Sequence, residues 1–166
     1  MGTRYIAFDL GNKRTGIATG DSVTGLAGPV GVIEVPLEDR GGAALLEAIA
    51  LAVEDALGVR NAFRGGGDGE VVVGLPVNMD GTEGPRATAV RAFAGRIAER
   101  TGRVVHLHDE RLTTADADWA LARSGLTHKQ KKERRDALAA AAILRDFLAG
   151  LGRGGGGDEP DEGGAE

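Results

Sequence analysis

Short apolar runs separated by polar turns dominate the beginning of the chain. The runs Tyr5–Phe8 and Ile17–Ala18 flank the polar stretch Gly11–Gly16, a pattern typical of two strands joined by a hairpin. A third apolar run over residues 27–35 follows without an intervening helical segment. Three strands in a row, joined by short turns, predict an antiparallel meander.

Helical and extended patterns alternate over the rest of the chain. Apolar side chains recur at helical spacing in some segments, whereas continuous apolar runs between them are typical of buried strands. Thr82 offers a helix cap, and Pro85 fits the first turn of the helix that follows. The predicted segments are, in order, helix 41–59, strand 70–76, helix 85–102, strand 103–108, helix 113–123, a basic connection 128–135 and helix 136–150.

This order of elements predicts the fold class. Strands separated by helices imply right-handed parallel crossovers between them, and the first and third strands of a meander run in the same direction. Only the second strand should therefore oppose the others. The sequence predicts an α/β protein with a mixed five-stranded sheet and helices on both faces.

Composition limits the class of protein. The chain has 166 residues and no cysteine, and no apolar run approaches the roughly 18 residues of a membrane helix. We therefore expect a cytoplasmic protein with no membrane partner. The glycine-rich stretch 152–166 contains five acids and one arginine, which predicts a disordered tail after a single domain over residues 1–151. Most of the net charge of −5 lies in this tail, so the nearly neutral domain is not excluded from binding nucleic acid.

Carboxylates occur at three places where strands end or a helix begins. Asp9 ends the first strand, Asp109 and Glu110 follow the fifth, and Asp136 begins the last predicted helix. Sites in parallel α/β sheets form beyond the carboxyl ends of strands, so these acids can converge. Carboxylates without cysteine favour Mg²⁺ or Mn²⁺, and a pair of such ions promotes hydrolysis of a phosphodiester. Each acid also has a structural interpretation, as a turn residue, a loop acid or an acid at a helix N-terminus.

Basic residues gather near the predicted site. The candidates for contacts with phosphates are Lys13, Arg14, Lys129, Lys131, Lys132 and Arg134. A solvated loop over residues 128–135 would account for the last four equally well. His106 and His108 share one face of a strand, which suits zinc, although no third soft ligand lies near them in the sequence. No series of aromatic residues accompanies the basic ones, which favours recognition of the nucleic-acid backbone over stacking on bases.

Four segments occur together in a characteristic order and spacing. They read FDLGNKRTGIATGD, VVGLPVNMDGTEG, HDERLTT and RDALAAAAILRDFL. Through these four segments the chain resembles the YqgF-type family of pre-16S ribosomal RNA nucleases, also described as Holliday-junction-resolvase-like. The resemblance extends from about Arg4 to Leu151. The resemblance implies a ribonuclease H-like fold, metal-dependent hydrolysis and a role in maturing the 5′ end of small-subunit ribosomal RNA. It also implies that Asp9, Glu110 and Asp136 are catalytic and bind the metal; the family's Asp-Glu-Arg pattern, rather than spacing, selects Glu110.

Three other functions fit parts of this pattern. A Holliday junction resolvase acting on branched DNA would use the same chemistry and needs two active sites, hence a homodimer, whereas an RNA nuclease can be a monomer. A non-catalytic nucleic-acid-binding module would leave the acids a structural role. An ATPase or sugar kinase of the actin-like superfamily would use the first hairpin as a phosphate loop, but it needs two such domains. The expected partners are therefore pre-rRNA or branched DNA, together with ribosomal particles.

Overall fold

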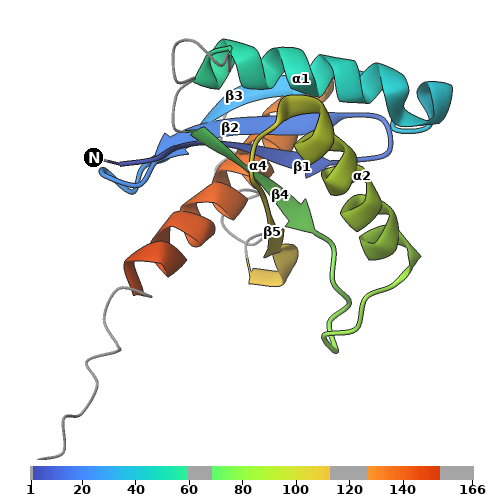
Figure 1. Ribbon diagram of the computed structural model, residues 1–166. Coiled ribbons are helices and arrows are strands. Elements are labelled where there is room, and N and C mark those ends of the chain that lie inside the picture. The colour runs from blue at the N-terminus through green and yellow to red at the C-terminus, as the bar shows by residue number, and fades with distance from the viewer. Residues whose placement is uncertain (1, 60–68, 113–126, 154–166) are drawn as a thin grey trace, which may run out of the picture.

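A computed structural model describes residues 2–59, 69–112 and 127–153 of the chain. Its strands form one sheet in the order β3-β2-β1-β4-β5 (Figure 1). The strands are β1 Arg4–Leu10, β2 Thr15–Asp21, β3 Ala27–Ile33, β4 Gly69–Leu75 and β5 Val105–Asp109. The helices are α1 Ala43–Leu57, α2 Pro85–Thr101 and α4 His128–Arg153, with short 3₁₀ turns at Asp39–Gly42 and Glu110–Leu112.

The sheet is mixed, as the order of elements predicts. Strand β2 runs antiparallel to both β1 and β3, whereas β4 runs parallel to both β1 and β5. The meander therefore leaves β1 at the centre of the sheet, between an antiparallel and a parallel neighbour. The predicted fold class, an α/β protein with a mixed five-stranded sheet and helices on both faces, is confirmed.

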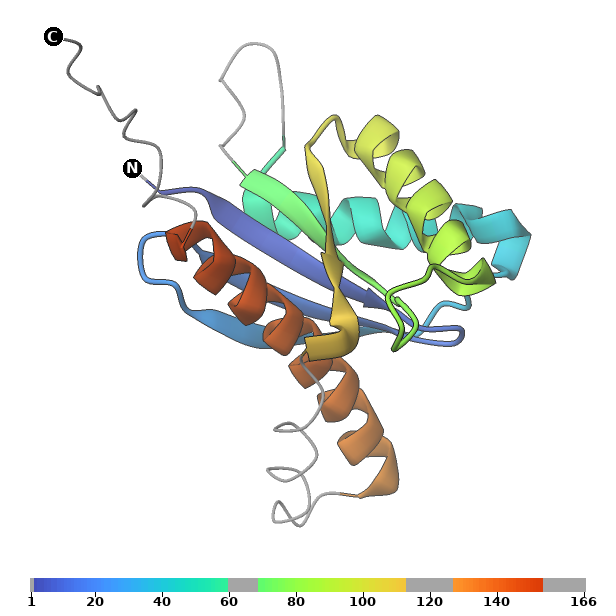
Figure 2. The same ribbon diagram turned by 90° about the horizontal axis from the view of Figure 1, so that it is seen from below.

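Alternation along β1 divides the protein into two cores. Ile6 and Phe8 belong to the larger core, which lies between the sheet and helices α1 and α2. Tyr5 and Ala7 belong to the smaller core beneath α4 on the opposite face. Figure 2 shows α4 lying across this second face. Because side chains alternate across a strand, Asp9 points to the same face as Tyr5 and Ala7, towards α4.

Small residues on β2 allow α4 to lie close to the sheet. Gly16, Ala18 and Gly20 pair with Asp9, Ala7 and Tyr5 of β1. A Cβ atom at Gly16 would collide with the backbone carbonyl of Asp136, so that the helix backbone rests directly on this position. Because Gly16 has no side chain, α4 approaches the sheet closely enough for Asp136 to lie next to β1.

Helix α4 begins earlier than the pattern predicts. The stretch 128–135, predicted as a basic connection, forms the first turns of the helix, and Asp136 lies well inside it. Its lysines and arginines are good helix formers, and the Thr127 hydroxyl accepts a hydrogen bond from the backbone N–H of Gln130 at 3.3 Å, as a capping residue does. The interpretation of Asp136 as an acid at a helix N-terminus is therefore wrong.

The start of α2 also differs from the prediction. Its N-cap is Gly84, and Pro85 is its first residue, as expected. Thr82 is not the cap, because its hydroxyl donates to Asp80 at 2.6 Å within the preceding loop. The predicted helix 113–123 and most of the predicted tail 152–166 lie outside the described residues.

Among the described residues, no helix combines the length and the apolar character needed to cross a membrane.

The close approach at Gly16 leads to a test by substitution. We expect Gly16→Ala to lower the free energy of unfolding by about 1–3 kcal/mol, because the added methyl group displaces α4 from the sheet. Gly28→Ala on β3 is the matched control, since a Cβ atom there meets nothing within 4 Å. Urea denaturation of both variants measures the difference, and equal stabilities would contradict the packing described here.

Candidate active site

Two carboxylic acids meet at the carboxyl end of the sheet. Asp9 lies near the end of β1, and Glu110 begins the 3₁₀ turn after β5. The strand between them, β4, carries Gly74 at the level of the site, beside His108 of β5. The carboxyl groups of Asp9 and Glu110 share a hydrogen bond. The two parallel neighbours of β4 thus bring together acids that are about 100 residues apart in the sequence.

Gly74 makes room for this carboxyl pair. A Cβ atom at Gly74 would lie 2.5 Å from Oε1 of Glu110 and 2.6 Å from Cδ1 of Ile143 on α4. Side chains do not approach so closely, and any larger residue at this position would push Glu110 away from Asp9. Glycine within a buried apolar strand is unfavourable for the strand itself, so Gly74, the last residue but one of β4, marks the space that the Glu110 side chain fills.

Burial changes the protonation of the pair. Loss of solvent, the negative charge of Asp9 and their shared hydrogen bond together raise the pKa of Glu110 to about 8. The pKa of Asp9 is also raised by burial, although its hydrogen bond with Glu110 opposes the shift. Two acids that share a hydrogen bond cannot easily both ionise. The pair therefore holds a proton near neutral pH unless a cation replaces it.

The third predicted acid, Asp136, lies nearby but has a different partner. The helix backbone at Asp136 rests on Gly16, the ladder partner of Asp9, and the negative charge of Asp136 raises the pKa of Asp9. The Nε–H of Arg14 donates to Oδ2 of Asp136 at 2.8 Å, and the two side chains are 31% and 30% exposed. Arg14, predicted to contact phosphates, thus forms an ion pair with a predicted catalytic residue.

Arg86 belongs to the site, and the sequence analysis missed it. It lies in the first turn of α2 and donates to the carbonyl of Leu10 at 2.9 Å and to Oδ1 of Asn12 at 3.2 Å. Its positive charge lowers the pKa of both Asp9 and Glu110. A helix dipole disfavours a cation in the first turn of a helix. An arginine directly after Pro85, at the start of a predicted helix, was therefore the signal in the sequence that could have revealed Arg86.

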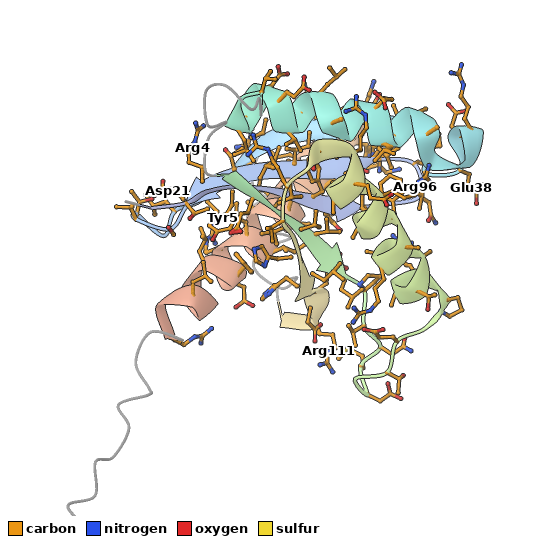
Figure 3. All side chains as sticks on the ribbon, in the orientation of Figure 1. Arg4, Tyr5, Asp21, Glu38, Arg96 and Arg111 are labelled. Carbon is orange, nitrogen blue, oxygen red and sulfur yellow. The ribbon has the colours of Figure 1, made fainter. Side chains whose placement is uncertain are left out.

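Asp109, which spacing alone could not separate from Glu110, is not part of the acid pair. Its Oδ2 lies 2.9 Å from Nε and 2.7 Å from Nη2 of Arg111, and its Oδ1 accepts a hydrogen bond from the Arg111 backbone N–H. Figure 3 labels Arg111 at the short turn that follows β5. Asp109 therefore closes this turn, while Glu110 reaches back over the sheet.

The predicted basic residues lie on two elements. Lys13 is exposed in the connection between β1 and β2. The first turns of α4 carry the remaining four, Lys129, Lys131, Lys132 and Arg134, of which only Lys131 is half-buried. Figure 2 shows this end of α4 projecting beyond the sheet. Lys129 makes a loose ion pair with Glu133 at 3.9 Å on the same helix.

The donor chemistry of Asp9 and Glu110 fits a hard divalent cation. Both are oxygen ligands, and a cation in place of their proton would offset the cost of two buried negative charges. Mg²⁺ is often held by one or two carboxylates together with substrate phosphates. The described residues contain no group of three or more His, Cys, Asp or Glu side chains arranged to hold a metal ion. Asp9 and Glu110 are therefore the two acids that suit a divalent cation, and Asp136 lies close by in an ion pair with Arg14.

The zinc interpretation of the histidines gains no support from the described part of the chain. His106 Nε2 lies 3.0 Å from Oε2 of Glu70, and His108 Nε2 lies 2.6 Å from Oδ2 of Asp146. Each histidine thus has one carboxylate partner, and no third ligand joins either pair there.

Proteins of known name and a solved structure resemble this chain over most of its length. A protein of Anaeromyxobacter sp. (strain Fw109-5) named "Putative pre-16S rRNA nuclease" is 40% identical over 147 residues, covering 89% of this chain and 97% of its own. A protein of the same name from Thiobacillus denitrificans is 39% identical over 86% of this chain and 89% of its own. The structure of T. thermophilus RuvC in complex with a Holliday junction substrate has a TM-score of 0.46 at 18% identity, over 90% of this chain and 96% of that one.

Fold and site together define an α/β protein with half-buried acids at the carboxyl ends of β1 and β5. The family described as "RuvX: Holliday junction resolvase" matches residues 3–150. The chain belongs to this family. The predicted family and the predicted class of enzyme, a nuclease acting on ester bonds, are confirmed.

The shared proton of the acid pair leads to a prediction about pH. Glu110 titrates near 4.5 in an unfolded chain and near 8 in the folded one, so between these values the folded protein binds more protons. Stability should therefore fall as the pH rises through this window. In EDTA we expect the melting temperature of the wild type to fall over this range and that of Glu110→Gln to fall less. Equal slopes for the two proteins would contradict a raised pKa at Glu110.

Proposed function

We propose that this chain is a divalent-metal-dependent nuclease that acts in the cytoplasm and takes part in processing the 5′ end of pre-16S rRNA. The observation that carries the proposal is the half-buried carboxyl pair of Asp9 and Glu110, held together over Gly74. Removing two neighbouring acids from water costs stability, and this cost favours a functional role for them. The names of the relatives at 39–40% identity support an RNA substrate.

In this proposal Asp9 and Glu110 hold Mg²⁺ or Mn²⁺, and Asp136 provides a third carboxylate. The bound ion would activate the attacking water and stabilise the leaving oxygen of the phosphodiester. The rigid end of β1 fixes Asp9, and Gly74 leaves the space through which Glu110 reaches it. Arg86 places a positive charge that favours the ionised form of both acids. The chain thereby prepares two oxygen ligands whose proton is easily exchanged for a cation.

The first turns of α4 offer a contact surface for the nucleic-acid backbone. Lys132 precedes Asp136 by four residues and so lies on the same side of the helix, about 6 Å along its axis. Lys129 lies three residues before Lys132 on the same side, whereas Lys131 and Arg134 occupy other sides of the same first turns. Positive side chains on a rigid helix recognise phosphates without reading bases. We therefore propose that the substrate strand runs from the acid pair along this end of α4, with Lys13 and Arg14 contacting it from the hairpin.

A second candidate function is cleavage of four-way DNA junctions. The family description favours it, since it names a Holliday junction resolvase. The acid pair would perform the same chemistry on either substrate. A symmetric junction needs two active sites and hence a homodimer, whereas RNA processing on a ribosomal particle is compatible with a monomer.

A cleavage assay tests the proposed activity. The full chain is incubated with a 5′-extended small-subunit RNA fragment or a four-way DNA junction, each with Mg²⁺, Mn²⁺ or EDTA. We expect metal-dependent RNA cleavage that falls by at least about 10²-fold in Asp9→Asn and Glu110→Gln, because each variant removes an oxygen ligand at the proposed metal site. Asp109→Asn is the matched control, since Asp109 pairs with Arg111 outside the acid pair.

The outcomes of this assay separate the candidates. Cleavage of the DNA junction alone would favour the resolvase. Cleavage that persists unchanged in EDTA and in both acid variants would contradict the proposed site. Binding of RNA without cleavage of either substrate would favour a non-catalytic binding module.

The role of the helical basic surface can be tested through salt. We expect Lys132→Gln to weaken RNA binding and to reduce the slope of log affinity against log salt by about 1, because one phosphate contact is lost. Arg145→Gln is the matched control, since Arg145 is exposed on the same helix about 20 Å further along its axis. Fluorescence anisotropy at several salt concentrations measures both slopes, and identical slopes would contradict contact at this end of α4.

A further inference from the structure

We infer that Arg14 couples substrate binding to cation binding, because it neutralises Asp136 until a substrate phosphate takes over its guanidinium. The inference rests on the proposed function and specifies how its site is regulated. Arg14 acts through Asp136 and is therefore a positioning residue in the free protein. In the complex it becomes a contact of the substrate.

The hairpin between β1 and β2 fixes the backbone position of Arg14. The backbone N–H of Gly11 donates to the Arg14 carbonyl at 2.9 Å and closes a tight turn. A Cβ atom at Gly11 would lie 2.5 Å from that carbonyl oxygen, so that only glycine permits the turn in this form. The turn holds the Arg14 backbone while its side chain spans the distance to α4. The guanidinium can therefore move without any change in the strands.

Asp136 is fixed from the other side. The backbone of α4 rests on Gly16 at this residue, and Gly16 is the partner of Asp9 in the ladder between β1 and β2. Asp136 is thus close enough to raise the pKa of Asp9 by its charge. In the described structure its carboxylate is turned to Arg14. If Arg14 leaves, an uncompensated negative charge remains beside the acid pair, and a divalent cation is the natural replacement.

The ion pair is suited to exchange. Both side chains are about one-third exposed, and ion pairs at this level of exposure are weak. Guanidinium groups bind phosphate oxygens through paired N–H donors, and the exposed Lys13 on the same turn adds a second charge for the same strand. A phosphate that binds the Arg14 guanidinium frees the Asp136 carboxylate to bind a cation. Likewise, a cation that binds Asp136 frees Arg14 to bind a phosphate. By linkage each ligand must then strengthen the binding of the other.

This coupling has a consequence for the reaction. Without substrate, Arg14 competes with the cation, so the complete set of three carboxylates forms only when a phosphate backbone is present. The protein is thereby protected from holding a fully loaded metal site in the absence of nucleic acid.

The first measurement is the affinity for Mn²⁺ alone. Electron paramagnetic resonance detects free Mn²⁺ in titrations of the full-length wild type, Arg14→Gln and Lys13→Gln. We expect Arg14→Gln to bind Mn²⁺ about two- to five-fold more tightly than the wild type, because the competing ion pair is gone. Lys13→Gln removes the same charge from the same turn but has no contact with Asp136, so its affinity should stay close to that of the wild type.

The second measurement is the coupling itself. Fluorescence anisotropy gives the affinity for a short labelled RNA hairpin with and without Mn²⁺, and a gel checks that the RNA is intact. For the wild type we expect Mn²⁺ to raise RNA affinity about five-fold or more. In Arg14→Gln this ratio should shrink towards one, and Arg14→Lys should restore part of it. Lys13→Gln should weaken RNA binding and keep the wild-type ratio.

The two ideas fail in different ways. If Arg14→Gln and Arg14→Lys are folded and keep the full Mn²⁺–RNA coupling, the inference about Arg14 is overturned while the proposed nuclease site stands. If the wild type binds Mn²⁺ no better than Asp9→Asn, the metal site of the proposed function is overturned, and the inference falls with it.

Discussion

The backbone of α4 lies directly on β2, because Gly16 has no side chain to hold the helix away. This contact determines more than packing. It sets the height of α4 above the sheet, and it places Asp136 next to Asp9 through the pairing of Gly16 with Asp9. It also determines where the basic first turns of α4 project beyond the sheet (Figure 2). The third acid and the basic surface are thus positioned by a single close approach between a helix and a strand.

The acid pair illustrates how the fold supports an unfavourable arrangement. Two half-buried carboxyl groups side by side cost stability, since loss of solvent disfavours their ionised forms. The larger core, on the opposite face of the same strands, supplies the compensating apolar packing: Ile6 and Phe8 are almost completely buried there. Charged side chains collect at the carboxyl ends of β1 and β5, while the middle of the sheet remains apolar. Stored electrostatic cost of this kind is typical of functional sites.

Much of the fold and part of the site could be predicted from the sequence. The period of apolar residues predicted the strands, the helices and the mixed sheet, because burial of one face determines each element locally. The carboxylates at strand ends were recognised for the same reason. Arg86 and the pairing of Arg14 with Asp136 were missed, since both depend on contacts between segments more than 70 residues apart. The basic stretch before Asp136 was interpreted as a loop because it has no apolar stripe, although lysine and arginine are good helix formers.

By itself, the sequence determined which residue types stand at the ends of which elements, because hydrophobic periodicity and turn residues act over a few neighbouring positions. It also determined that hard oxygen ligands, and no thiolates, are present for a metal. Only the tertiary structure decided which acids meet. Glu110 reaches Asp9 across the space left by Gly74, Asp109 turns back to Arg111, and Asp136 is held by Arg14. The physical reason is that strand order and the close approach of α4 define distances between residues that no local pattern connects.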